Sequence, residues 1–177
     1  VPQVGDGGAG TAPVVRVDEA DRLGVHGTSH PYGRDAAILQ LGRERVGTAI
    51  MLQQLNRRGW GDRIALNDAL AAYQAFVVER VVAADGTVRD DIHRPGRARL
   101  YNYPWFARFL LDQGEVDLAA SIMDRYYANG GEHFLAFGVG PVMTDLAERR
   151  SAAGSAAEAG AMRERLLSHA RRFLDYG

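Results

Sequence analysis

Residues 85–111 read DGTVRDDIHRPGRARLYNYPWFARFLL, and they join a long polar connection to the start of an apolar helix. Connections between helices are commonly about 2 to 8 residues long, so this one needs a reason beyond chain reversal. It opens with Asp85-Gly86, a tight-turn signal. It ends in the sequence YNYPW at residues 101–105, where Pro104 suits a first helical turn because its missing N–H would be unpaired there anyway.

Apolar residues at three- and four-residue intervals extend on both sides of this segment. Upstream, we expect one helix over residues 36–57 and a second that begins after Asp62, a good N-cap residue, and runs to about residue 81. Downstream, the spacing and the glycine stops predict helices over 104–113, 115–128, 141–150 and 156–175. Successive helices pair, so the sequence predicts an all-α fold of stacked antiparallel helical hairpins.

The chain divides into two parts by composition. Residues 1–35 are rich in Gly, Pro and Val without a helical period, and we expect an extended lead-in or an interdomain linker. Residues 36–177 form the helical-hairpin domain. Its last helix carries Ser155 and Glu158 at the spacing of a capping box. The glycines of residues 5–10 have no strand before them and no helix after them, which argues against a nucleotide-binding loop.

Composition excludes several classes of protein. The apolar runs fall short of the roughly 20 residues that cross a bilayer, so we expect no membrane association. The chain has no Cys, which excludes disulfides and thiolate sites and is compatible with a secreted or a cytoplasmic protein. All 21 basic residues are Arg, as in a GC-rich bacterium, and a net charge of -1 argues against nucleic-acid binding.

Other single residues carry weaker expectations. His26 and His30 are four residues apart, but the residues between them do not favour a helix and no third ligand has suitable spacing. We therefore expect no metal, and nothing in the sequence requires a cofactor. We expect Trp60 to plug the first hairpin. His169, near the end of the last helix, is expected to act as a cation that interacts with the helix dipole.

Carboxylates, arginines, amides and aromatic rings in one segment favour a carbohydrate site. Hydrolysis of a glycoside needs one carboxylic acid and a second carboxylate, and Asp90 and Asp91 are the leading candidates, with His93 as a further catalytic candidate. A second polar and aromatic cluster precedes the first helix, and loops at one end of a hairpin array gather together. The candidate substrate-binding residues are Tyr101, Asn102, Tyr103, Trp105, Arg94, His30, Tyr32, Arg34 and His133.

Three of these features together resemble the (α/α)-toroid enzymes, which include six-hairpin glycosidases and polysaccharide lyases. The features are the successive hairpins, the crossover DGTVRD at residues 85–90, and the helix entered through Tyr101-Asn102. The α-1,6-mannanase-like hydrolases of that group are similar in having a Tyr-Asn at an inner helix and an adjacent Asp pair. The resemblance covers roughly residues 36–175 and implies an oligo- or polysaccharide substrate cleaved with the help of aspartates.

Two alternatives remain open at this point. A polysaccharide lyase would neutralise a uronate carboxylate with Arg or Asn and would remove the adjacent proton with Tyr or His. A non-catalytic helical interaction module would instead use the aromatic residues after Tyr103 purely as core. Three hairpins correspond to half of a six-hairpin ring, so we expect a second helical half or another domain of the same protein as a possible partner.

Overall fold

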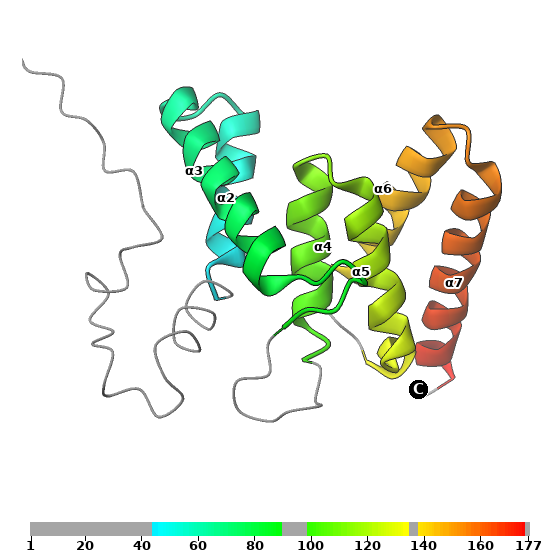
Figure 1. Ribbon diagram of the computed structural model, residues 1–177. Helices are drawn as coiled ribbons and strands as arrows, with labels where there is room; N and C mark the ends of the chain where they lie inside the picture. The colour runs from blue at the N-terminus through cyan, green and yellow to red at the C-terminus, as the bar shows by residue number, and fades with distance from the viewer. Residues whose placement is uncertain (1–43, 90–98, 135–137, 176–177) are drawn as a thin grey trace, which may run out of the picture.

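The computed structural model describes residues 44–89, 99–134 and 138–175, and this part of the chain is helical (Figure 1). The α-helices are α2 (Val46–Arg57), α3 (Arg63–Phe76), α4 (Asn102–Asp112), α5 (Val116–Ala128), α6 (Val139–Ala152) and α7 (Ala156–Leu174). A π-helical turn, η2 (Val77–Val81), continues α3, and a short 3-10 helix, η3 (Gly131–His133), follows α5. The described residues contain no strand, only an isolated bridge between Val82 and Val88. The predicted all-α fold is confirmed.

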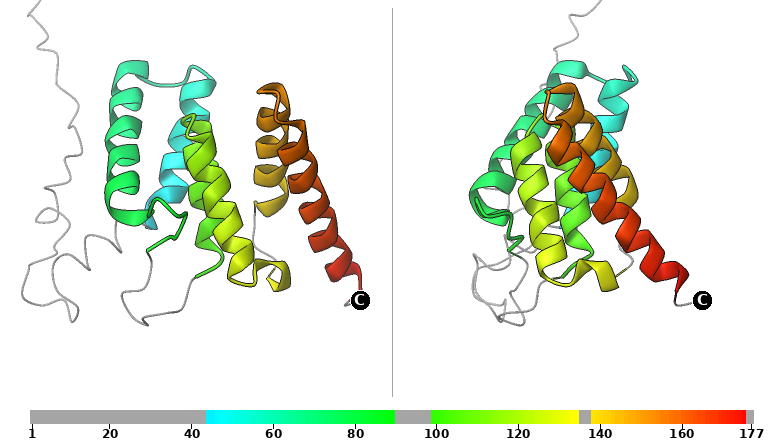
Figure 2. Two further views of the ribbon diagram at one scale, coloured as in Figure 1. Left: turned by 45° about the vertical axis from the view of Figure 1, so that its right-hand side comes forward. Right: turned by 90° about the vertical axis from the view of Figure 1, so that its right-hand side faces the viewer.

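Consecutive helices pack in pairs, α2 with α3, α4 with α5 and α6 with α7. Figure 2 shows these pairs following one another across the molecule. The first helices of the pairs are also neighbours, because α4 contacts both α2 and α6. No helix in the described ranges has the length and apolar character needed to span a bilayer.

Helix α4 lies at the centre of this arrangement. Eight of its residues are buried, among them Phe106, Phe109 and Leu110, which have no exposed surface. The edge of the Tyr73 ring on α3 meets Phe109 with ring centroids 5.1 Å apart. From α2, the buried Gln53 donates from Nε2 to the Phe109 carbonyl oxygen at 2.9 Å. Both helices of the first pair are therefore fastened to α4.

An ionic network crosses the first helices of the three pairs. The Asp112 side chain, only 1% exposed, accepts from Arg108 at 2.6 Å and pairs with Arg57 Nη1 on α2 at 2.9 Å. Arg108 also pairs with Asp145 on α6. The network thus joins α2, α4 and α6 through the C-terminal end of α4.

The predicted turn at Asp85-Gly86 is confirmed, and it packs on α5. The Gly86 N–H donates to the Ala83 carbonyl at 2.9 Å, and Asp85 Oδ1 accepts from the Thr87 N–H at 3.0 Å. Gly86 is buried with φ +80°, and a Cβ built there would lie 2.1 Å from the Ser121 carbonyl oxygen. Only glycine allows this close approach to α5.

Helix boundaries agree with the sequence in several places and differ in others. Asp62 is the predicted N-cap of α3, since its Oδ1 accepts from the N–H groups of Ile64 at 2.9 Å and Ala65 at 3.2 Å. Ser155 precedes α7 as predicted, but its side chain makes no capping hydrogen bond. The capping-box prediction is therefore wrong, and Glu158 instead pairs with Arg150 at 3.2 Å. The predicted first helix is described only from residue 44 onward.

The prediction that Trp60 plugs the first hairpin is wrong. Its side chain lies at the turn between α2 and α3 and is 58% exposed. The Arg58 guanidinium covers one face of the ring, 5.4 Å from its centroid. Gly59 and Gly61 both have positive φ, so they form a tight turn that carries the indole outward instead of across the pair.

Candidate functional site

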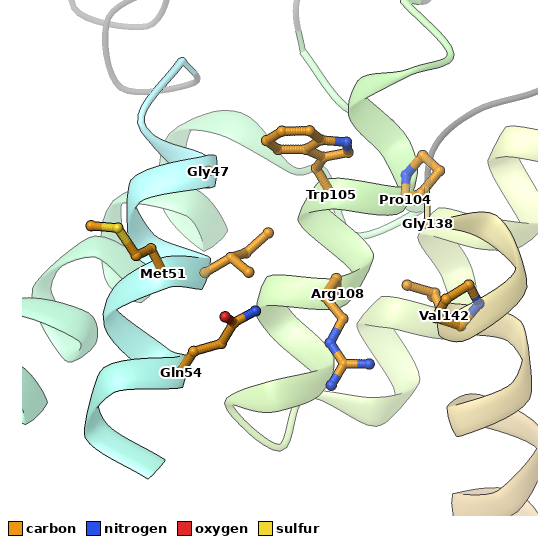
Figure 3. Close-up of a pocket in the computed structure, with 10 residues that line it drawn as sticks. Gly47, Met51, Gln54, Pro104, Trp105, Arg108, Gly138 and Val142 are labelled. Atoms are coloured by element: carbon orange, nitrogen blue, oxygen red, sulfur yellow. The ribbon is translucent and has the colours of Figure 1, made fainter. Parts of the chain in front are cut away.

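A groove lies where α2, α4 and the start of α6 meet (Figure 3). We call it the first-helix groove, and its volume is about 390 Å³. It is lined by Gly47, Ile50, Met51, Gln54, Pro104, Trp105, Arg108, Gly138, Pro141 and Val142. Most of these side chains are apolar, so the groove offers contact area more than hydrogen bonds.

Trp105 forms the rim of the first-helix groove and is 40% exposed. Tyr101, one turn earlier at the start of α4, is 46% exposed, and its hydroxyl oxygen accepts from Arg99 at 3.3 Å. Residues four apart lie on one face of a helix, so both rings belong to the same side of α4. The start of the helix therefore presents two aromatic rings on one side of α4, and Trp105 of this pair lines the groove.

The Trp105 ring packs directly against Gly47 of α2. The Trp105 ring lies beside Gly47 in Figure 3, and a Cβ built on Gly47 would lie 2.8 Å from Cζ3 of the indole. Any side chain at position 47 therefore pushes the ring away from α2. The absence of a side chain at position 47 of α2 therefore sets the position of the Trp105 ring.

Gly47→Ala is accordingly expected to move the Trp105 ring toward solvent. In a Trp60→Phe background, where Trp105 is the sole remaining Trp, the emission should shift to longer wavelength and acrylamide quenching should increase. Gly140→Ala is the matched control, since nothing lies within 4 Å of a Cβ there. Its emission should stay unchanged while stability rises by about 0.4–1 kcal/mol. Identical spectra for both variants would contradict the conclusion that Gly47 sets the position of the Trp105 ring.

Polar groups in the first-helix groove are few, and one of them is already engaged. Burial opposes the charge of Arg108, yet hydrogen bonds with the carboxylates of Asp112 and Asp145 hold its guanidinium pKa above the usual value. Arg108 therefore stays cationic, and its guanidinium is already paired with Asp112 and Asp145. Gln54 points from α2 toward α4 in Figure 3 and is the remaining polar side chain of the lining.

Several predicted site residues lie outside the described residues. The catalytic candidates Asp90, Asp91 and His93 belong to this group, as does Arg94. The upstream candidates do as well, namely His30, Tyr32 and Arg34. The chain is described again from residue 99, directly before the aromatic pair at the start of α4.

The structure separates the remaining candidates from Tyr101 and Trp105. Asn102 is 7% exposed and Tyr103 is fully buried, with its hydroxyl accepting from Asn129 at 3.2 Å. We assign both side chains to packing, because both are buried whereas Tyr101 and Trp105 are exposed. His133 is exposed but lies beside Arg172 of α7, 3.0 Å from its guanidinium, and does not line the groove.

Sequence reasoning did not select the α2 wall of the groove. Gly47, Ile50, Met51 and Gln54 follow one another at intervals of three, one and three residues, which places them on one helix face. That spacing is visible in the sequence, but it predicts only that this face of the helix is buried.

Comparison with protein-family models, curated proteins and solved structures finds no match to this chain.

Proposed function

We propose that this chain is part of a carbohydrate-active domain and that it holds a glycan at the mouth of the first-helix groove. The observation that carries the proposal is the pair of half-exposed rings, Tyr101 at 46% and Trp105 at 40%, on one face of α4. Such rings combine an apolar face, which suits the C–H surface of a sugar, with a polar edge. The groove beside them supplies a concave surface of about 390 Å³.

The arrangement of pairs supports a toroid-like architecture as part of the same proposal. In a toroid of hairpins, one helix of each pair faces the interior. Here α2, α4 and α6 are consecutive neighbours and jointly line the groove. We infer that they correspond to inner helices, and that further hairpins would extend the array.

Cleavage is proposed to come from the segment that enters α4. In this hypothesis one of Asp90 and Asp91 protonates the leaving oxygen, and the other acts as nucleophile or as base for water. His93 would assist with proton transfer. The lyase alternative instead assigns carboxylate neutralisation to Arg94 and proton removal to Tyr101 or His93. Tyr103 is buried, so it does not contribute to either scheme.

Glycan binding is tested by tryptophan fluorescence in the Trp60→Phe variant, in which Trp105 is the only tryptophan. An α-1,6-linked mannose oligosaccharide should shift the emission to shorter wavelength and saturate, because stacking removes water from the indole. Tyr101→Ala should weaken binding by about tenfold, the equivalent of roughly 1.4 kcal/mol. Phe134→Ala is the control, because it removes a 40% exposed ring that does not line the groove. An emission spectrum unchanged by both mannose and uronate oligomers would refute glycan binding at this site.

Cleavage of the glycan is measured by two assays that do not depend on the fluorescence test of binding. New reducing ends from the neutral oligosaccharide, lost in Asp90→Asn or Asp91→Asn, would support hydrolysis. Ultraviolet absorbance from unsaturated ends with oligogalacturonate, and no new reducing ends from neutral glycans, would replace hydrolysis by β-elimination.

A second candidate is favoured by the apolar lining of the groove. Ile50, Met51, Pro104, Pro141 and Val142 resemble the wall of a groove that receives the apolar face of a peptide helix. In that case the chain is a non-catalytic helical interaction module. Trp105 emission would then respond to an amphipathic helical peptide and remain unchanged with every glycan tested.

A further inference from the structure

A second cleft lies between the C-terminal ends of α5 and α7, which meet in Figure 1 near the end of the described chain. We call it the His169 cleft, and its volume is about 600 Å³. It is lined by Asp124, Tyr127, Ala128, Glu132, Arg165, Ser168, His169 and Arg172. None of these residues lines the first-helix groove. Its walls are mostly polar, in contrast to the apolar groove.

His169 is buried, with 4% of its surface exposed. Burial is the main reason that its pKa is lowered, with the Glu132 carboxylate opposing and Arg172 reinforcing the effect. The imidazole is therefore neutral near pH 7. The expectation of a cation near the helix dipole is wrong, because the ring packs against Tyr127 and Phe173 at centroid distances of 5.6 and 5.2 Å.

The hydrogen bonding of His169 leaves one ring nitrogen unused. The Tyr127 hydroxyl lies 3.2 Å from Nδ1. Burial raises the pKa of Tyr127 to about 12, so the phenol keeps its proton and can donate it to Nδ1. In the neutral ring the remaining proton is then on Nε2. Among the described residues Nε2 has no hydrogen-bond partner, although it is buried. A buried donor without an acceptor is unfavourable, which points to an acceptor that the described residues do not supply.

The two arginines of the cleft differ in their partners. Arg165 pairs with Asp124 and lies over the Tyr127 ring, 5.3 Å from its centroid. Arg172 forms no ion pair with a carboxylate in the part of the chain that the structure describes, and its Nη1 lies 3.0 Å from His133 Nε2. Among the described residues, Arg172 is therefore the cationic side chain of the cleft that lacks a carboxylate partner.

From this geometry we propose that the His169 cleft binds a small monocarboxylate, which accepts hydrogen bonds from His169 Nε2 and from the Arg172 guanidinium. The planar guanidinium matches a carboxylate with two parallel donors. Glu132 also lines the cleft, and its carboxylate would repel a dianion more strongly than a single charge. Nε2 is covered, so a ligand reaches it only after a side chain at the rim moves. Arg172 is long and exposed, so its guanidinium can turn aside and then contact the bound carboxylate.

The proposal is tested by titrating the protein with sodium acetate at constant ionic strength and following the imidazole C–H resonances. The His169 signal is assigned by its loss in His169→Gln. It should shift and saturate with acetate. Arg172→Gln should weaken the affinity by about tenfold, because a charge-assisted hydrogen bond is lost. Arg171→Gln, which removes the same charge from a neighbouring position outside the lining, should leave the affinity unchanged.

Three results would overturn the carboxylate site. The first is a His169 resonance that stays constant or drifts without saturation in acetate. The second is an equal loss of affinity in Arg171→Gln and Arg172→Gln, which indicates a general charge effect. The third is tighter binding of inorganic phosphate than of acetate, which indicates a tetrahedral anion. None of these readouts involves Trp105, so the glycan proposal stands or fails independently.

Discussion

Gly86→Ala is expected to lower the free energy of unfolding by about 3 kcal/mol. Alanine at φ +80° costs about 1–2 kcal/mol because its Cβ approaches the following carbonyl. The same Cβ would lie 2.1 Å from the Ser121 carbonyl oxygen and 2.6 Å from the Ile122 backbone nitrogen. These are backbone atoms of α5, which cannot move aside as a flexible side chain can. Overpacking of this kind typically costs a further 1–3 kcal/mol.

Urea denaturation measures this loss, and Gly154→Ala separates its two causes. Gly154 has φ +85°, and nothing lies within 4 Å of a Cβ built there. That variant should therefore lose only about 1 kcal/mol, from backbone strain alone. The difference between the two variants reports the contact between the turn and α5. Equal losses would mean that the turn does not press against α5 in solution.

Asp112→Asn is the second substitution with a large expected effect, a loss of about 2–3 kcal/mol. The Asp112 carboxylate is 1% exposed and is shared by Arg57 and Arg108. Removing one partner from a buried pair costs about 3–5 kcal/mol, since it leaves buried charge uncompensated. Here Arg57 and Arg108 are 49% and 27% exposed, so water screens part of that charge. The expected loss lies correspondingly lower.

Asp124→Asn provides the comparison for a surface pair. Asp124 and Arg165 are 64% and 46% exposed, and such pairs contribute about 0–1 kcal/mol. Thermal and urea unfolding of both variants should therefore rank Asp112→Asn as clearly less stable. If the two variants unfold at the same temperature and the same urea concentration, the ionic network between α2, α4 and α6 does not hold the helix pairs to one another.

Local signals in the sequence predicted the helices well. Asp62 begins α3 because its short carboxylate reaches two free N–H groups, and this depends only on neighbouring residues. Asp85-Gly86 forms its turn for a similar local reason. Gly114, at φ +93°, follows the last turn of α4 as predicted. In each case the decisive contact joins residues a few positions apart, which a single sequence displays directly.

Features that depend on distant parts of the chain were predicted less well. The first-helix groove is lined by residues far apart in the sequence, such as Gly47 and Trp105, and neither residue indicates the other in sequence. His169 was expected to be charged, since its position near a helix end is a local property. His169 is buried against Tyr127 and Phe173. Tyr127 lies far away in the sequence, so its contact with His169 is visible only in the folded structure. The periodicity of α4 predicted a core helix, but not that Tyr101 and Trp105 stay exposed while Tyr103 is buried.

The central place of α4 bears on how the chain is made. The ribosome releases α2 and α3 before α4, and domains fold as their residues emerge. Until α4 follows, Gln53 has no Phe109 carbonyl to donate to, and the Tyr73 ring has no Phe109 ring to meet. The first pair thus leaves the exit tunnel with its apolar faces open. Chaperone contact during synthesis should concentrate on that interval and end once α4 is available.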